Sequence, residues 1–281
     1  MMKQFAVIGH PIGHSLSPLM HNTAFKLCGL DCHYEMLDIE PTSLKLAIGQ
    51  FREQKWGGFN VTIPHKETII PLIDDVVQEG RAIGAVNTVV NHDNKLIGYN
   101  TDVIGVERSL DPDREKIEGK MCTILGSGGV ARSVAYVLTH KIRPKAITFS
   151  ALFPEQAHAL IKSLSSNNVH FNVIHCTDAA LETAIKESTL IVNATDVGMF
   201  PHVLHSPLPN HQWLSNKHIL FDLIYRPLTT RLQSDAHAAG AKIIDGLGMF
   251  IHQGAAAFQL WTGMEMPLEQ IRHVLEEKLA E

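Results

Sequence analysis

The sequence contains few cysteines, and their spacing matches no metal or redox motif. The four are Cys28, Cys32, Cys122 and Cys176, and no two of them form a C-x-x-C pair. This argues against a zinc ribbon and a thioredoxin-like site. The chain also has 17 histidines, but none belongs to the H-E-x-x-H pattern of a helical zinc site. We therefore predict reduced, structural cysteines and no bound metal.

Strong net charge and long apolar runs are also missing. A net charge of −5 gives no electrostatic reason to expect nucleic acid or an anionic membrane as a partner. No apolar run approaches the length of a membrane span. The N-terminal apolar stretch breaks at Gly9 and Pro11, too early for a signal-peptide core. These features predict a cytoplasmic protein, and 281 residues suit two domains.

The stretch 60–66, Asn-Val-Thr-Ile-Pro-His-Lys, organises the first half of the chain. Alternation of polar and β-branched residues predicts a strand with one buried face. Pro64 cannot donate to a sheet ladder, so the strand should end there. Lys66 then follows a strand end, where open α/β sheets tend to place ligands. The alternative for Lys66 is an ordinary solvated surface lysine.

Two hydroxyls precede the first predicted helix. Residues 5–8 form a predicted strand, and Ser17 followed by Pro18 is typical of a helix start. Ser17 is explained equally well as a simple helix cap. Ser15 has no such explanation, and the pair could hold a polyol at this strand-to-helix turn.

Polar residues recur at later element ends. We predict a strand over 84–90 with Asn87 in its middle, so the Asn87 amide either faces solvent or bonds something specific. Asp102 begins a predicted helix and could simply cap it. The charged segment 111–119, which contains proline and glycine, is predicted to be a linker.

After residue 120 the pattern becomes a regular alternation of strands and helices. A strand over 121–125 leads into a G-x-G-x-x-A turn and a helix over 130–140, which is the setting of a dinucleotide-binding turn. The turn comprises Gly126, Ser127, Gly128, Gly129, Val130 and Ala131. Further strands are predicted at 146–149, 169–174, 190–192, 219–222 and 242–244, giving the six of a full Rossmann sheet. A tight turn without a ligand is the alternative.

Together these segments resemble the shikimate dehydrogenase family, and the resemblance spans the whole chain. It is carried by residues 14–18 (His14-Ser15-Leu16-Ser17-Pro18), 60–66, 84–88, 100–102, 126–132, 193–195, 222–225 with Pro227 and Thr230, and 245–249 with Gln253. The resemblance implies an α/β fold with an N-terminal substrate domain and a Rossmann-like, doubly wound dinucleotide-binding domain. The C-terminal helices would return to the first domain. The implied bounds are 1–103 with 247–281 for the substrate domain and 104–246 for the cofactor domain.

The same resemblance implies NAD(P)-dependent reversible reduction of 3-dehydroshikimate to shikimate, a step of aromatic amino-acid (chorismate) biosynthesis. Lys66 and Asp102 would form the catalytic pair, with Lys66 exchanging a proton with the reacting oxygen. Ser15 and Ser17 would hold the substrate carboxylate, with Tyr225 nearby, and Thr62, Asn87, Asp102 and Gln253 would bind ring hydroxyls. The cofactor residues would be Gly126, Ser127, Gly128, Gly129, Val130, Ala131, Ser150, Asn193, Ala194, Thr195, Gly246 and Met249.

The sequence departs from the family at the second cofactor strand. NADP-using members usually carry Asn-Arg-Thr at its end, whereas this chain has Phe-Ser-Ala-Leu-Phe-Pro at 149–154. It therefore lacks both the arginine that clamps a 2′-phosphate and the acidic residue that binds the ribose of NAD. Smaller departures are Val103 and Asp196. We expect NADP on family grounds, with NAD as the alternative.

Two other functions stay open. One is an NAD-dependent quinate/shikimate dehydrogenase, although Ser17 favours shikimate because quinate-preferring relatives tend to carry threonine there. The other is a shikimate-binding regulator that has lost its cofactor affinity, for which the altered segment 150–154 argues and the retained Lys66 and Asp102 argue against. The oligomeric state is expected to be monomer or homodimer.

Overall fold

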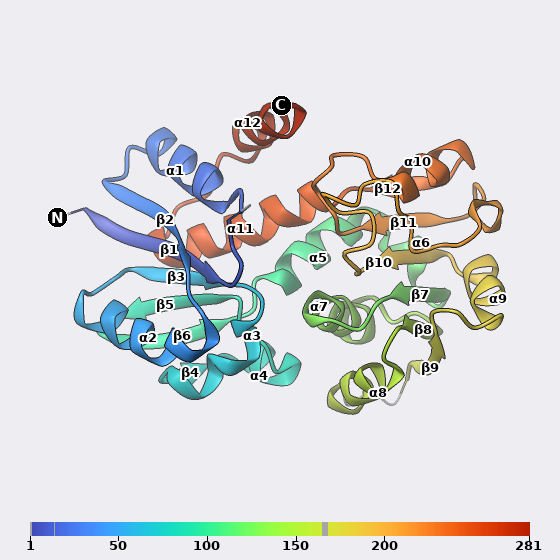
Figure 1. Cartoon of the computed structure of the whole chain (residues 1–281), viewed down its shortest axis with the longest axis horizontal. Helices are drawn as coiled ribbons and strands as arrows, with labels where there is room; N and C mark the ends of the chain where they lie inside the picture. Colours follow the sequence, from blue (N-terminus) through green and yellow to red (C-terminus); the bar gives the residue numbers. More distant parts are fainter. Residues whose placement is uncertain (1, 14, 165–167) are drawn as a thin grey trace. The chain divides into compact units, whose positions relative to one another are not determined.

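The computed structural model describes residues 2–13, 15–164 and 168–281. It divides into two compact units, the first comprising Met1–Gly105 and Ile251–Lys278 and the second Val106–Phe250 and Leu279–Glu281. His14, which opens one of the family motifs, lies outside the described residues. The predicted α/β class is confirmed, because both units are built on a sheet with flanking helices (Figure 1).

The sheet of the first unit has the strand order β2-β1-β3-β5-β6-β4. β3 pairs antiparallel with β5 and β5 with β6, while the pairs β1–β2, β1–β3 and β4–β6 are parallel. The bounds are β1 (Lys3–Gly9), β2 (Cys32–Asp38), β3 (Gly58–Val61), β4 (Asp75–Val76), β5 (Thr88–His92) and β6 (Lys95–Tyr99). The parallel strands β1 and β3 therefore present their carboxyl ends at one edge of the sheet, which is where the motif residues follow.

Helices cover both faces of this sheet. Successive side chains of a strand point to opposite faces, so the apolar residues of β1 are buried on both sides. Ala6 and Ile8 of β1 belong to a core with α2, whereas the Phe5 ring packs against Phe25 of α1 and Trp261 of α11. The helices are α1 (Ser17–Leu27), η1 (Pro41–Ser43), α2 (Leu44–Glu53), α3 (His65–Thr68), η2 (Ile70–Leu72), α4 (Gln78–Ile83), α5 (Asp102–Leu110), α11 (Gly246–Thr262) and α12 (Leu268–Ala280). The boundary between the units falls inside α5 and α11. Within the described ranges, every helix falls short of the length and apolar character that a membrane span needs.

The predicted strand over 84–90 is wrong in its first half. Helix α4 ends at Ile83 and is capped by Gly84 in the left-handed conformation, with φ of +72°, a backbone that glycine adopts at little cost. β5 begins only at Thr88. Asn87 therefore lies at the entrance of the strand and not inside it, which frees its side chain to make specific contacts.

His21 of α1 is a fully buried histidine in an aromatic cluster. Its ring stacks on Tyr34 at 4.5 Å and lies 5.2 Å from the Trp261 ring, and neither ring nitrogen finds a hydrogen-bond partner among the described residues. Desolvation lowers the pKa of His21 from 6.5 to about 3. The imidazole is therefore neutral in the folded chain, since a charged ring here would have no compensation.

This burial predicts acid-sensitive stability. The unfolded chain takes up a proton at His21 below about pH 6.5 while the folded chain does not, so stability is full above that pH and falls as the pH drops towards 3. Between pH 7 and pH 5 this group should cost about 2 kcal/mol of the free energy of unfolding. Urea unfolding at both pH values should show the loss in the native chain and a loss smaller by that amount in His21→Phe. Equal pH slopes in the two proteins would contradict the assignment.

The second unit contains a fully parallel sheet in the order β12-β11-β10-β7-β8-β9. Numbered along the chain, this is the strand order of a Rossmann sheet, with its switch point between β7 and β10. The strands are β7 (Met121–Leu125), β8 (Ala146–Ala151), β9 (His170–His175), β10 (Leu190–Asn193), β11 (Ile219–Asp222) and β12 (Lys242–Ile244). The helices are α7 (Gly129–Val137), η4 (Leu138–Ile142), α8 (Pro154–Ser163), α9 (Ala180–Glu187), η5 (His211–Trp213) and α10 (Arg231–Ala238).

The predicted linker over 111–119 is also wrong. The segment forms η3 (Asp111–Asp113) and α6 (Arg114–Ile117) within the second unit. Asp113 is buried and forms ion pairs with Lys116 at 2.9 Å and Lys242 at 2.5 Å. Burial alone would raise the pKa of Asp113, but the hydrogen bonds from the two lysines outweigh it and lower that pKa. The ion pair between Asp113 and Lys242 therefore attaches this segment to β12.

Candidate active site

Lys66 lies on a short helix fixed to the sheet from both sides. α3 starts four residues after β3 ends. The imidazole of His65, fully buried, lies 2.6 Å from the Ile39 carbonyl oxygen through its Nε2. The Val86 N–H donates to the Lys66 carbonyl at 2.8 Å. The backbone beneath the Lys66 side chain is thus held by two other segments of the first unit, at Ile39 and Val86.

The Lys66 side chain forms an ion pair with Asp102. Nζ donates to Asp102 Oδ2 at 2.6 Å, and the exposed fractions of the two side chains are 17% and 8%. The second carboxylate oxygen, Oδ1, accepts from Asn87 Nδ2 at 2.8 Å. Both oxygens of Asp102 therefore have donors, and the ammonium group is held beside them with limited contact to solvent. Such a group can exchange a proton with an oxygen placed next to it.

Ser15 and Ser17 are arranged differently from a simple helix cap. α1 begins at Ser17 with Leu16 as the N-cap residue and no capping side chain there. The Ser15 Oγ accepts from the Ser17 backbone N–H at 3.2 Å. The Ser17 side chain is buried and forms a hydrogen bond with the phenol of Tyr34. The cap explanation for the Ser17 hydroxyl is therefore wrong.

Thr62 and Gln253 are the remaining predicted substrate residues of the first unit. Thr62 follows β3, its N–H donates to the Ile8 carbonyl at 2.9 Å, and a Cβ at Gly9 would lie 2.5 Å from its methyl group. Gly9 is therefore required for this approach of the two strand ends. Gln253 lies on α11, half-buried, next to Gly254, where a Cβ would displace the end of the Met20 side chain. α11 thus packs closely on α1 at this point.

The glycine-rich turn lies between β7 and α7 in the second unit. Gly126 has φ of +101°, and a Cβ there would lie 2.9 Å from the Ala194 carbonyl oxygen. Its N–H donates to the Ser150 carbonyl at 2.8 Å. Gly128 is exposed and α7 starts at Gly129. The turn therefore presents backbone N–H groups at a helix N-terminus, with no side chain in front of Gly128, and this donor set suits a pyrophosphate.

A second loop of this unit is fixed by buried hydrogen bonds. Asn193 at the end of β10 donates from Nδ2 to Asp222 Oδ1 at 3.0 Å, and its Oδ1 accepts from the Thr195 N–H at 3.1 Å and hydroxyl at 2.7 Å. Thr230 donates to Asp222 Oδ2 at 2.6 Å. Burial raises the pKa of Asp222, and its donors oppose part of that shift. Asn193 and Asp222 therefore hold the loop that contains Ala194 and Thr195.

Gly246, Met249 and Tyr225 lie beyond the last two strands of the sheet. A Cβ at Gly246 would lie 2.5 Å from the Leu223 carbonyl, so only glycine fits at this helix start. Met249 is buried. The Tyr225 ring stacks on Phe250 at 4.6 Å, and burial raises the pKa of its phenol. Tyr225 belongs to the second unit, whereas Lys66 and Asp102 belong to the first.

The segment after β8 is apolar and exposed. Ser150 is buried within the strand, but Leu152 and Phe153 are 61% and 51% exposed before α8 starts at Pro154. Ser127 of the glycine-rich turn donates to Gln156 Oε1 of α8 at 3.5 Å. Lys162 is exposed in the last turn of α8. The segment 150–154 carries no charged side chain, so the structure supplies no ionic group from it for a 2′-phosphate.

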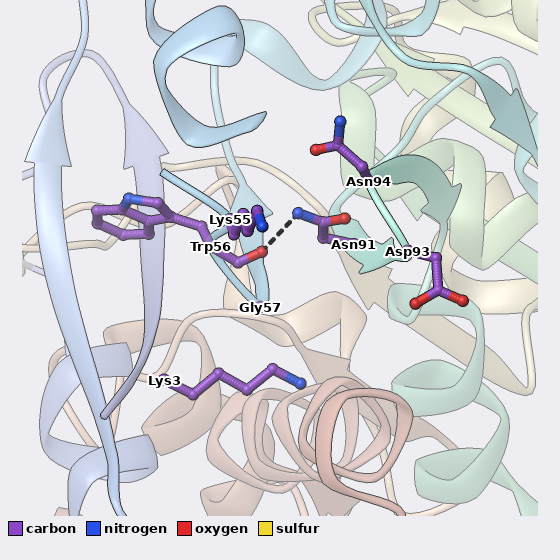
Figure 2. Close-up of a pocket in the computed structure, with 7 residues that line it drawn as sticks. All are labelled: Lys3, Lys55, Trp56, Gly57, Asn91, Asp93 and Asn94. Atoms are coloured by element: carbon purple, nitrogen blue, oxygen red, sulfur yellow. Dashed lines mark hydrogen bonds between the residues drawn. The ribbon is translucent and has the colours of Figure 1, made fainter. Parts of the chain in front are cut away.

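A separate concavity of the first unit lies away from the Lys66–Asp102 pair. The volume of this concavity is about 380 Å³. Figure 2 shows the residues that line it, among them Asn91, whose Nδ2 donates to the Trp56 carbonyl at 2.8 Å. Its lining is Lys3, Lys55, Trp56, Gly57, Asn91, Asp93 and Asn94. It lies at the amino ends of β1 and β3, the edge opposite to Thr62 and Lys66. The four cysteines are free thiols, and the described residues include no group of three His, Cys, Asp or Glu side chains that could hold a metal.

A Rossmann sheet with a glycine-rich turn, in a chain whose other α/β unit holds a lysine–aspartate pair, defines an α/β protein of the dinucleotide-binding class. Comparison with known proteins is more specific. Residues 7–89 match the model of the shikimate dehydrogenase substrate binding domain, and residues 246–276 that of the shikimate 5′-dehydrogenase C-terminal domain. The chain belongs to the shikimate dehydrogenase family.

Individual relatives cover nearly the whole chain. Shikimate dehydrogenase (NADP(+)) from Moorella thermoacetica is 40% identical over 98% of this chain and 92% of its own length. A crystal structure of a shikimate dehydrogenase in complex with NADP+ has a TM-score of 0.91, with 37% identity over 100% of this chain and 96% of its own. Shikimate 5-dehydrogenase from Listeria monocytogenes, in complex with shikimate and NAD, has a TM-score of 0.89 and 35% identity over 98% and 96%.

Proposed function

We propose that this protein is an oxidoreductase that interconverts 3-dehydroshikimate and shikimate with NADP, a step of aromatic amino-acid (chorismate) biosynthesis. The observation that carries the proposal is the Lys66–Asp102 pair at 2.6 Å, with Asn87 bonded to the second carboxylate oxygen. The family membership and the names of its relatives give the substrate and the cofactor.

The chain's own contribution to the chemistry is proton transfer. Bound NADP would supply or accept the hydride. In the direction of reduction, Lys66 Nζ donates a proton to the oxygen of the ketone as negative charge develops on it, and in the reverse direction it accepts that proton. Asp102 holds the ammonium group by a charge-assisted hydrogen bond. A positioned acid of this kind contributes about 10²–10⁴-fold in rate.

Substrate binding is assigned to residues at the carboxyl edge of the first sheet and to two later residues. Ser15 and Ser17 hold the carboxylate with Tyr225, and the ring hydroxyls bond to Thr62, Asn87, Asp102 and Gln253. Support comes from the buried position of Ser17 and from Asn87, whose second amide hydrogen remains for a ligand once the first is given to Asp102. On this proposal, 1–103 with 247–281 form the substrate domain.

The cofactor is assigned to the region 104–246 and to the first turn of α11, which starts at Gly246. The glycine-rich turn would hold the pyrophosphate, and the other contacts would come from Ser150, Asn193, Ala194, Thr195, Gly246 and Met249. The exposed turn at Gly128 and the fixed 193–195 loop support this. The names of the relatives favour NADP over NAD. The segment 150–154 has no charged side chain and therefore favours neither cofactor.

Initial rates in four pairings test the assignment: shikimate or quinate, each with NADP or NAD. We expect the highest kcat/KM for shikimate with NADP. Turnover confined to NAD, above all with quinate, would move the protein to the alternative of an NAD-dependent quinate/shikimate dehydrogenase. The segment 150–154, which lacks the usual group for either cofactor, is the observation that keeps this alternative open.

The same segment motivates the second alternative, a shikimate-binding regulator. Thermal unfolding separates it from an enzyme, because a ligand at 100 times its Kd stabilises the folded state by about 2.7 kcal/mol. An enzyme should be stabilised by shikimate and by a dinucleotide. Stabilisation by shikimate alone would favour the regulator. A cytoplasmic location and a monomeric or homodimeric state stay predictions of the same proposal.

A further inference from the structure

Behind the Lys66–Asp102 pair lies a buried polar network, of which the proposed mechanism uses only Asn87. Its members are Tyr34, Asn60, Asn87, Thr88 and Thr101, each of which is at most 7% exposed. Thr88 Oγ1 is central, lying 2.9 Å from Asn60 Nδ2, 3.0 Å from Asn87 Oδ1 and 3.0 Å from Thr101 Oγ1. Polar groups at this depth are costly unless bonded, so their arrangement is strongly determined.

The orientation of the Asn87 amide is fixed by the donors around its Oδ1, which are the Thr88 hydroxyl at 3.0 Å and the Thr101 hydroxyl and backbone N–H at 3.1 and 2.7 Å. Asn87 Oδ1 accepts from the Thr101 backbone N–H at 2.7 Å, and since a backbone N–H can only donate, the atom facing it must be the amide oxygen. The NH₂ group consequently faces Asp102 Oδ1 at 2.8 Å. A flipped amide would direct its oxygen at the carboxylate and repel it. The orientation of the Asp102 carboxylate therefore depends on the groups that hold Asn87 Oδ1 in place.

One series of hydrogen bonds in the network runs in a single direction towards Asp102. The Tyr34 hydroxyl donates to Asn60 Oδ1 at 2.6 Å, and Asn60 Nδ2 donates to Thr88 Oγ1. Thr88 Oγ1 in turn donates to Asn87 Oδ1, and Asn87 donates to Asp102. Each acceptor in the series is also the next donor group, an arrangement in which the bonds polarise one another.

The series begins at a tyrosine whose position is itself fixed. The Tyr34 ring stacks on His21 with an interplanar angle of 17°. Burial raises the pKa of Tyr34 well above its usual value, and the hydrogen bond with Ser17 opposes part of that shift. The phenol therefore keeps its proton and remains a donor to Asn60. Through Ser17, the series also reaches a residue assigned to the substrate carboxylate.

From this geometry we propose that Thr88 is a positioning residue, which together with Asn60 and Tyr34 orients the Asn87 amide and, through it, the Asp102 carboxylate that holds Lys66. The inference rests on the proposed function, because it concerns the same lysine–aspartate pair. It predicts that the Thr88 hydroxyl affects the chemical step more than substrate or cofactor binding.

The test compares Thr88→Val with Thr88→Ser. Valine keeps the β-branched shape and removes the hydroxyl, whereas serine keeps the hydroxyl. Loss of alignment at a reacting group can cost about 10²-fold, so we expect Thr88→Val to lower kcat by about 10- to 100-fold and Thr88→Ser to stay within about threefold of the native chain. The Kd of NADP, measured by calorimetry, should stay within about twofold in both, and that of shikimate should weaken less than kcat falls.

Thermal unfolding midpoints of both variants provide the folding control. If Thr88→Val is fully folded and has the kcat of Thr88→Ser, the inference is wrong. If Thr88→Val does not fold, Tyr34→Phe replaces it: the ring stack is kept, the first donor is lost, and kcat should fall several-fold with the NADP Kd unchanged. A native kcat in that variant would also overturn the inference. Absence of turnover in the native chain would instead contradict the proposed function.

Discussion

Replacing Lys66 with methionine is expected to lower the turnover of shikimate by about 10²–10⁴-fold, the usual contribution of a positioned general acid or base. Methionine has a side chain of similar length without the ammonium group. The variant loses the proton donor for the reacting oxygen and leaves Asp102 Oδ2 without the partner that lies 2.6 Å away in the native chain. The loss should appear in kcat, because the proton moves in the transition state.

Steady-state rates with shikimate and NADP, together with the Kd of each ligand, measure this effect. Lys45→Met is a matched control, since Lys45 is exposed on α2 and should leave kcat unchanged. A Lys66→Met variant that binds shikimate and retains more than about a tenth of native kcat would place the proton transfer on another group. Loss of NADP binding in the variant would indicate a folding defect and not a catalytic one.

Asp102→Asn is expected to lower kcat by about 10²-fold while the Kd of NADP stays within about twofold. The substitution removes the charge that orients the Lys66 ammonium, and it presents an amide to two donors that both require an acceptor, Lys66 Nζ and Asn87 Nδ2. One of the two then faces an NH₂ group. Displacement of Lys66 or Asn87 should therefore misalign the site even though the fold is retained.

The control for this variant is Asp93→Asn. Asp93 lies in the β5–β6 turn with its side chain 94% exposed, so removal of its charge should change neither rate nor binding. Asp102→Asn should also weaken shikimate binding by less than it lowers kcat. Equal losses in turnover and in cofactor binding would count against a catalytic role for the Lys66–Asp102 pair.

The main features of the fold followed from the sequence because they depend on local pattern. The alternating strands and helices and the G-x-G-x-x-A turn predicted the Rossmann sheet, and the order β12-β11-β10-β7-β8-β9 confirms it. Errors arose where the conformation or the contacts of a single residue decided the outcome. Gly84 ends α4 in the left-handed conformation, and this moved the start of β5 to Thr88. Buried Asp113 turned a charged segment into part of the second unit.

The contacts behind the candidate site could not be predicted from the sequence, because they depend on strand register. Asn60 of β3 and Thr88 of β5 are direct antiparallel partners, and this pairing brings together side chains 28 positions apart. Asn193 and Asp222 are likewise register partners in the second sheet. Motif resemblance singled out these residues without their contacts to one another, since adjacency across a sheet is fixed only when the strands are paired.

The most direct test of the central claim is the initial rate of NADP reduction by the native chain with shikimate, measured in parallel with Lys66→Met. The account predicts steady formation of reduced cofactor in the native chain and a rate lower by about 10²–10⁴-fold in the variant, with shikimate raising the unfolding temperature of both. Absence of turnover in the native chain, or equal rates in the two proteins, would contradict it.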